Sequence, residues 1–380
     1  MRAEGVAVDW PKMKSAGSSS RTHARSTAGA VAMTALDRRS GWLWLGLASS
    51  SFVALQCTAA RKTPNVAASA PAVASASAGG SGSLEGTPLP VTVVASNVDA
   101  RQLVADGDDL FWADSGTGTL VSMHWPTKAT RLLAWSQTGV QRIAVDAQRV
   151  YWTKGEGLGG GGVYSVARSG GGKVDMLMGF GPVKVGGPKG LAVTNDGVYL
   201  AWSVANGDVS RVRKDGQPDA VFASLQAMPT DLAVDSGNVY WTVLGSGTSN
   251  GVVMRRPLGS GELSTVAHHQ VQPAWLIADG AGAVFWVVGG TGGSPGAVLR
   301  SSDGGPKVLA PVRGGSGLAT DSTWVYFASQ EDGLVQKVRK DGTERTLLAR
   351  DQAAPRGLAV ISDAVLWVNR GDRTIVSVPR

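Results

Sequence analysis

The stretch Pro229-Thr230-Asp231-Leu232-Ala233-Val234-Asp235-Ser236-Gly237-Asn238-Val239-Tyr240-Trp241-Thr242 decides the fold of this chain of 380 residues. It consists of a short apolar segment, an Asp-Ser-Gly-Asn turn, and a second segment of β-branched and aromatic residues. Because such residues favour strands, while Asp, Gly and Asn favour tight turns, the stretch predicts a β-hairpin.

Six further copies of this hairpin pattern follow one another along the chain. Aligned on their first apolar residue, the copies begin at Leu103, Ile143, Leu191, Leu232, Leu276, Leu318 and Leu358. Successive positions differ by 40, 48, 41, 44, 42 and 40 residues. A period in the low forties built from short strands is typical of a β-propeller, with one four-stranded blade per repeat. The sequence therefore predicts an all-β, seven-bladed β-propeller over residues 89–380.

The second segment of each copy carries large apolar residues at three consecutive positions, as in Val239-Tyr240-Trp241 and Val150-Tyr151-Trp152. Consecutive side chains of a strand point to opposite faces of the sheet. Both faces must therefore be buried, as they are in blades stacked around an axis. We interpret these aromatic residues as core residues and not as a binding site.

The remainder of each copy predicts a third strand, a tight turn and a fourth strand. Asp-Gly turns such as Arg339-Lys340-Asp341-Gly342 favour two-residue hairpins. The seventh copy stops after its third strand at residues 374–378, whereas an unpaired strand pattern at residues 91–95 precedes the first copy. We expect residues 91–95 to complete the last blade and close the ring, which removes exposed strand edges.

Residues 89–380 resemble the bacterial seven-bladed propellers of the NHL/YWTD-like type. Tyr151-Trp152-Thr153 and Tyr240-Trp241-Thr242 are similar to the Tyr-Trp-Thr-Asp motif, and Phe111-Trp112-Ala113-Asp114 keeps its Asp. Most copies lack that Asp, and YWTD propellers usually have six blades. The motif is structural in that family, so the resemblance implies a fold and not a site.

Residues 1–57 have the features of a leader and signal segment, in which Met33 is an alternative start. Arg38-Arg39 precede an apolar run at residues 42–55, which is shorter than the roughly 20 residues of a membrane-spanning helix. The run ends at Ala54-Leu55-Gln56-Cys57, which resembles the lipobox of bacterial lipoproteins and implies lipidation of Cys57. Ala54 and Gln56 depart from the lipobox pattern. The alternative is ordinary signal cleavage, which would give a soluble secreted or periplasmic protein.

Residues 58–88 are rich in Ala, Ser, Gly and Pro, and we expect a disordered linker there. Together with a lipidated Cys57, such a linker predicts an exported protein anchored to a membrane of the cell envelope by lipid alone.

Charge and cysteine content exclude several classes of function. Residues 1–57 hold seven Lys and Arg against three Asp and Glu, a net +4, which leaves only +3 of the total of +7 for the rest of the chain. This balance argues against a nucleic-acid surface. Cys57 is the single cysteine, so no intrachain disulfide and no cysteine metal site can form. We expect a monomer without a cofactor.

The candidate ligand site is the channel mouth, defined as the end of the central channel where loops join fourth strands to first strands and second strands to third strands. Residues one or two positions before the first-strand anchors should gather there. The candidates for ligand binding are Arg101, Arg142, Lys189, Asp231, Trp275 and Arg356. Four cations against one carboxylate, with an indole for stacking, favour a small anionic ligand or glycan, or else a protein of the envelope.

Two classes of function remain open. The first is a non-catalytic binding or scaffold module. The second is a channel-mouth enzyme of the streptogramin-lyase or lactonase type, because seven-bladed streptogramin lyases resemble this chain in repeat style and use a His/Glu/metal constellation. Here His268-His269 end a fourth strand, near Glu262, and we expect a solvated rim position. We therefore assign no catalytic residue and no metal ligand. Arg370-Gly371-Asp372 is interpreted as ordinary turn chemistry.

Overall fold

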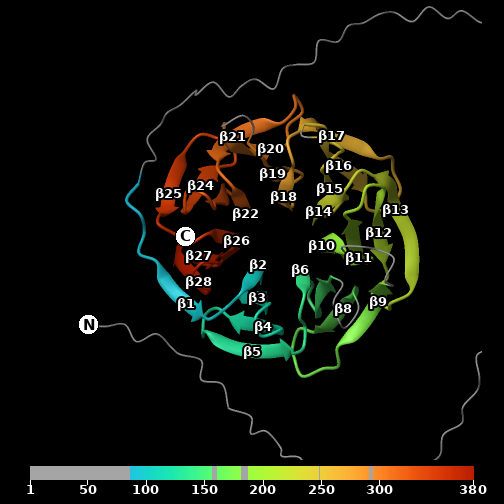
Figure 1. The fold of residues 1–380 in the computed structure, drawn as a ribbon, viewed down its shortest axis with the longest axis horizontal. Helices are drawn as coiled ribbons and strands as arrows, with labels where there is room; N and C mark the ends of the chain where they lie inside the picture. The colour runs from blue at the N-terminus through green and yellow to red at the C-terminus, as the bar shows by residue number, and fades with distance from the viewer. Residues whose placement is uncertain (1–85, 156–160, 181–186, 248, 291–293) are drawn as a thin grey trace, which may run out of the picture. The chain divides into compact units, whose positions relative to one another are not determined.

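The computed structural model describes residues 86–155, 161–180, 187–247, 249–290 and 294–380. Seven four-stranded sheets lie around a central axis as the blades of a propeller (Figure 1). This architecture confirms the all-β, seven-bladed propeller predicted from the repeats. The leader, Cys57 and nearly all of the expected linker lie outside the described residues.

Within each blade, every strand is antiparallel to its neighbours, and the blades follow one another in chain order. Blade I contains β2 (Ala100–Asp106), β3 (Asp109–Asp114), β4 (Thr119–His124) and β5 (Ala129–Ala134). Blade II contains β6 (Val140–Val145), β7 (Arg149–Lys154), β8 (Gly161–Ala167) and β9 (Asp175–Phe180). Blade III contains β10 (Pro188–Val193), β11 (Val198–Trp202), β12 (Gly207–Val212) and β13 (Pro218–Gln226). Blade IV contains β14 (Pro229–Val234), β15 (Asn238–Val243), β16 (Gly251–Pro257) and β17 (Ser264–Gln270).

The last three blades follow the same plan. Blade V contains β18 (Ala274–Ala278), β19 (Val284–Val288), β20 (Gly296–Arg300) and β21 (Lys307–Val312). Blade VI contains β22 (Gly315–Thr320), β23 (Trp324–Ser329), β24 (Leu334–Arg339) and β25 (Arg345–Ala349). Blade VII contains β26 (Pro355–Ile361), β27 (Ala364–Asn369), β28 (Thr374–Pro379) and β1 (Thr92–Ser96). The first strands of the blades lie nearest the axis and the fourth strands form the rim (Figure 1).

The ring is closed by β1, which pairs with β28 in the same sheet. Thr92 lies opposite Ser377 and Ser96 lies opposite Thr374. The strand therefore begins and ends one residue later than the sequence pattern predicted. Just beyond it, Val98 N donates a hydrogen bond to Arg373 O at 2.8 Å. Blade VII is thus built from both ends of the propeller, which makes blades I and VII neighbours.

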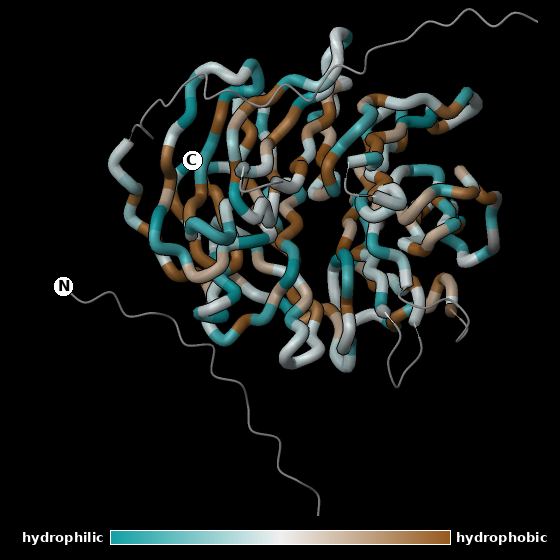
Figure 2. Tube along the Cα trace, turned by 45° about the horizontal axis from the view of Figure 1, so that its top comes forward, coloured by the Kyte–Doolittle hydropathy of each residue, from teal (hydrophilic) through white to brown (hydrophobic). Residues whose placement is uncertain are grey.

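The core lies between blades, as the runs of three apolar residues predicted. Trp152, Trp241, Trp286 and Trp367 are fully buried, together with the neighbouring tyrosines and phenylalanines of the second strands. One cluster joins Phe111 of blade I to Trp152 of blade II. Hydrophobic residues accordingly follow the strands, while the connecting loops are mostly hydrophilic or intermediate (Figure 2). Packing across each seam makes the stability of one blade depend on its neighbours.

Four buried tryptophans donate their indole N–H to a glutamine at the end of the preceding blade. The Nε1–Oε1 distances are 3.1 Å for Trp152–Gln137, 3.1 Å for Trp241–Gln226, 2.9 Å for Trp286–Gln270 and 3.1 Å for Trp367–Gln352. Each glutamine also donates from Nε2 to a carbonyl two residues earlier, as Gln270 does to His268 O at 2.6 Å. This second bond fixes the amide so that its oxygen faces the indole. The repeat pattern of the sequence did not predict a role for these glutamines.

The aspartates that end the first strands cap turns. Asp235 Oδ1 accepts hydrogen bonds from Gly237 N at 2.8 Å and Asn238 N at 2.7 Å, and its Oδ2 accepts one from the Tyr240 hydroxyl at 2.8 Å. Despite partial burial, these bonds hold the pKa of Asp235 below its ordinary value. Equivalent aspartates also bind cations from a neighbouring blade. The pairs are Lys214–Asp146 at 2.7 Å, Lys340–Asp279 at 3.0 Å and Arg380–Asp321 at 3.0 Å.

Replacing Gln270 by Leu should lower the free energy of unfolding by about 1–3 kcal/mol, because the buried Trp286 indole N–H loses its acceptor. Urea denaturation of the Gln270→Leu variant measures this loss. The exposed Gln330 provides the control, and Gln330→Leu should change stability little.

The same substitution made in a Trp286→Phe background should cost less, since that background has no indole N–H to satisfy. Blade VI already has such an apolar pair, with Phe327 on the second strand and Val312 fifteen residues earlier, both buried. Equal losses in the two backgrounds would show that the glutamine–tryptophan bond adds nothing to stability.

Candidate ligand-binding site at the channel mouth

An axial cavity of ≈ 280 Å³ lies among the first strands. The polar and aromatic residues that line it are Gln102, Arg142, Asp231, Trp275 and Thr320. Apolar residues of the first strands, such as Leu191 of β10 and Leu318 of β22, complete its wall. The cavity therefore combines an apolar wall with a few polar groups, which is the usual composition of a small-ligand site.

Each first strand is irregular just before its anchor residue, where the pairing register with the second strand shifts. The shift lies between Val140 and Arg142 in blade II and between Ala274 and Ile277 in blade V, and the other five blades have one at the equivalent place. A bulge changes the direction of its side chains relative to a regular strand. Trp275 lies on such a bulge with φ 52°, which is uncommon for a bulky residue. The mouth is thus lined by bulge residues.

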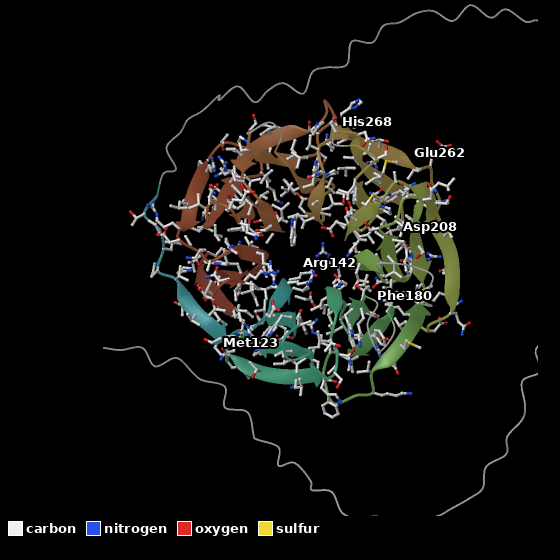
Figure 3. The ribbon with its side chains drawn as sticks, viewed as in Figure 1. Met123, Arg142, Phe180, Asp208, Glu262 and His268 are labelled. Atoms are coloured by element: carbon white, nitrogen blue, oxygen red, sulfur yellow. The ribbon has the colours of Figure 1, made fainter. Side chains whose placement is uncertain are left out.

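Arg142 of blade II reaches past blade III to residues of blades IV and V. Its Nη2 lies 3.6 Å from Asp231 Oδ2, and its guanidinium carbon lies 5.3 Å from the centroid of the Trp275 ring. Figure 3 shows Arg142 near the centre of the ring of blades. Three of the six predicted residues are therefore brought together, and the positive charge of Arg142 is shared between a carboxylate and an aromatic face.

Asp231 has a structural role in addition to its ion pair. Its Oδ1 accepts a hydrogen bond from Leu232 N at 3.1 Å, and its Oδ2 accepts one from Leu276 N of blade V at 3.2 Å. Burial raises the pKa of the Asp231 carboxyl, against the opposing effects of Arg142 and the backbone N–H groups. Gln102 ties blade I to blade II in the same way, since its Oε1 accepts a hydrogen bond from Ile143 N at 3.1 Å.

Arg356 and Arg101 belong to a second group, at the seam between blades VII and I. Arg356 Nη2 donates to Asp99 Oδ1 at 3.1 Å, and only 14% of the Arg356 side chain is exposed. Burial, together with the positive charges of Arg370 and Arg101, lowers the pKa of Arg356. We call Arg101, Arg356 and Arg370 the arginine cluster. Asp99 and Arg370 are additions to the residues that the sequence predicted.

Lys189 stands apart from both groups. It is exposed, and it does not line the axial cavity. Within the described residues, neither Lys189 nor the exposed side chain of Arg101 has an ion pair or a side-chain hydrogen bond. The structure thus divides the six predicted residues into the Arg142–Asp231–Trp275 group, the pair Arg101–Arg356, and Lys189 alone.

The histidine pair lies far from the axis. His268 and His269 are exposed near the C-terminal end of β17, the outermost strand of blade IV, and Figure 3 shows His268 and Glu262 at the rim. Among the residues that the structure describes, no three His, Cys, Asp or Glu side chains come together as metal ligands. The same part of the chain contains no helix with the length and apolar character of a membrane span.

Comparisons with known proteins give the fold alone. No family model and no curated protein sequence matches the chain. Virginiamycin B lyase from Staphylococcus aureus is similar in structure, with a TM-score of 0.60 and 11% identity over 77% of this chain and 99% of that one. The computationally designed protein Ika8 has a TM-score of 0.53 and 15% identity over 76% and 99% of the two chains. A chain of the nidogen/laminin complex has a TM-score of 0.47 and 18% identity over 63% and 92%.

The raised pKa of Asp231 predicts a distinctive pH dependence for an Asp231→Asn variant. A carboxyl that binds its proton more tightly when folded contributes stability below its unfolded pKa, about 3.9, and loses that contribution as pH rises through its folded pKa. Asn cannot ionise, so the stability of the variant relative to wild type should increase as pH is raised from about 4 to about 7. Thermal unfolding at constant ionic strength measures the difference.

Asp235→Asn is the matched control, because the pKa of Asp235 is shifted in the opposite direction to that of Asp231. The lowered pKa of Asp235 adds stability above the unfolded pKa, and this contribution is lost as pH falls through the folded pKa. The disadvantage of Asp235→Asn should thus be greatest near neutral pH. A stability difference for Asp231→Asn that follows the same course as that of Asp235→Asn would contradict a raised pKa at Asp231.

Proposed function

We propose that the propeller is a non-catalytic binding module whose channel mouth takes a small ligand with an anionic group. The observation that carries this proposal is the uncompensated positive charge at the mouth. Among the described residues, Arg142 pairs with Asp231 and Arg356 pairs with Asp99, while Arg101 and Lys189 have no ion pair, so these four cations and two carboxylates leave +2. Arg101 and Lys189, which have no partner within the described residues, stand at the channel mouth of a rigid scaffold and favour binding of an oxyanion.

Binding is favoured over catalysis by the placement of the histidines. His268 and His269 are exposed at the rim, and His124 is hydrogen-bonded to Asp109 at 3.0 Å, at the end of β4 away from the mouth. A general acid or base must lie within hydrogen-bond reach of the reacting group. The alternative, a channel-mouth enzyme of the lyase or lactonase type, is supported by the fold likeness to virginiamycin B lyase alone.

A thermal-shift screen with citrate, glucuronate, sulfate and acidic glycans tests the proposal. A ligand at a hundred times its dissociation constant adds about 2.7 kcal/mol to the stability of the folded protein, which raises the melting temperature measurably. The Arg101→Ala/Lys189→Ala double variant should lose part or all of this shift, and high salt should weaken it.

Arg313→Ala is the control, because Arg313 is 56% exposed and precedes β22 on the same side of the propeller. Lys214 and Lys340 are unsuitable as controls, since they are partly buried and pair with aspartates of neighbouring blades at 2.7 Å and 3.0 Å. The ion pairs of Arg313 with Glu331 and Asp332, in contrast, are long, 3.9 Å and 3.8 Å, and exposed. Equal loss in the Arg313 variant would indicate nonspecific charge attraction. No shift with any of these anions would remove the proposed function and favour a scaffold whose partner is a protein of the envelope.

We further propose that the protein is exported and anchored through a lipid on Cys57. The support is the apolar run that ends just before the only cysteine of the chain. In a bacterial host, the wild type should incorporate labelled fatty acid and partition with membranes, since several acyl chains anchor a protein stably. A Cys57→Ser variant that is labelled and membrane-bound to the same extent would favour ordinary signal cleavage instead.

A further inference from the structure

We infer that the anion-binding subsite is the arginine cluster, Arg101, Arg356 and Arg370, and that it takes the dianionic phosphate group of a phosphomonoester. This inference rests on the proposed function and narrows it to one seam of the propeller and one ligand chemistry. It places the charged end of the ligand beside the axial cavity and not on Arg142.

Ring closure brings the three arginines together from opposite ends of the propeller. Arg101 lies on β2 of blade I, Arg356 lies on β26 of blade VII, and Arg370 lies in the turn between β27 and β28. Gly357 permits this approach because it has no Cβ atom. A Cβ atom at that position would clash with Arg101 O, at a distance of 2.7 Å. The φ of Gly357 is 58°, a conformation that other residues rarely adopt. The close contact of β26 with β2 therefore sets Arg356 next to Arg101.

The charge of the cluster is not neutralised by its surroundings. Within the part of the chain that the structure describes, Asp99 is the only carboxylate paired with it, through Arg356 Nη2, so three guanidiniums and one carboxylate leave +2. Asp372 and Arg373, the next residues of the same turn, add one charge of each sign and do not change this balance. Asp114 is buried, and it is left out of this count because its carboxylate is held by the backbone N–H groups of Asp99, Gly116 and Thr117 and forms no ion pair with a cluster arginine in the described residues. A ligand group of charge −2 would balance the cluster.

Hydrogen-bond donors of the cluster also lack partners. Arg356 Nε is buried and has no acceptor within the described residues. The guanidiniums of Arg101 and Arg370 are exposed and make no hydrogen bond to that part of the chain. A buried donor without an acceptor costs stability, and a guanidinium fork matches the geometry of a phosphate. A phosphomonoester supplies three acceptor oxygens and a charge of about −1.5 to −2 at neutral pH.

The rest of the ligand has a place in the axial cavity. Gln102 and Gly357 follow Arg101 and Arg356 in the chain, and both line this cavity. Trp275 lines it as well and offers a ring face. An ester group attached to the phosphate would extend from the arginine cluster over the mouth toward Trp275, which distinguishes a phosphate ester from free phosphate.

Titration calorimetry of the full chain with methyl phosphate and methyl sulfate tests the charge requirement. The two ions have the same shape, but at pH 8 methyl phosphate is a dianion and methyl sulfate is a monoanion, since the second pKa of the phosphate is about 6. Methyl phosphate should bind at least about tenfold more tightly at matched ionic strength. This preference should disappear near pH 5, where both ions carry a single charge. Equal affinities at pH 8 would overturn the dianion assignment.

Substitutions locate the site. Arg370→Gln and Arg101→Gln should each weaken methyl phosphate binding by about tenfold or more, while the matched control Arg313→Gln should not. Binding that survives both cluster variants and is lost in Arg142→Gln would overturn this inference and leave the proposed function intact. Absence of binding by every anion would remove both.

Phenyl phosphate and inorganic phosphate test whether the bound phosphate group belongs to an ester or is free phosphate. Trp275→Ala should weaken binding of phenyl phosphate and leave that of inorganic phosphate unchanged. Equal affinity of the wild type for the two compounds would mean that the cluster takes free phosphate, against the ester assigned here.

Discussion

The pairing of β1 with β28 is the constraint on which the rest of the molecule depends. A propeller buries its apolar surface between blades, so an unclosed ring would leave one face of its first blade and one face of its last blade without a partner. Joining the two chain ends in one sheet makes blades I and VII neighbours and completes the packing of Leu110 and Trp112 against Leu366 and Ile375. The closure also creates the arginine cluster, whose members are brought together by the ring and not by the repeat.

The residue directly before the anchor of the first strand takes one of three physical roles in different blades, and this difference makes the mouth asymmetric. Directly before the anchor residue, Gly317 and Gly357 lie so close to the next first strand that a Cβ atom would come within 2.8 Å and 2.7 Å of its backbone. At the same position, Gln102 and Asp231 use their side chains to accept the backbone N–H of the next blade. Arg142 and Trp275 do neither, and their side chains occupy the mouth. The repeated hairpin specifies the scaffold, and the departures from it specify the site.

The sequence predicted the fold because every local signal of the repeat favours the same architecture. These signals are the apolar pairs of strands, the Asp-capped turns and the period of 40 to 48 residues. Within the site, the sequence correctly predicted that Arg142, Asp231 and Trp275 lie together. It wrongly placed Lys189 and Arg356 in the same group. Position along a strand does not specify the side-chain direction at a bulge, nor how far an arginine reaches. Arg370 was missed because it belongs to a turn that becomes a neighbour of β2 only through closure. The Gln270–Trp286 bond was missed because the pair is 16 residues apart, on two blades.

The ligand is inferred from cations at the mouth that are unpaired among the described residues, and not from the net charge of the whole chain, because cations elsewhere form ion pairs between blades. At the opposite ends of the strands, cations such as Lys214, Lys340 and Arg380 each bind an aspartate of a neighbouring blade. Partly buried, hydrogen-bonded pairs of this kind connect the blades and leave no charge for a partner. At the mouth, Arg101, Arg370 and Lys189 have no such partners in the described part of the chain. Arg101, Arg370 and Lys189 are therefore available for binding, and all three lie at the channel mouth.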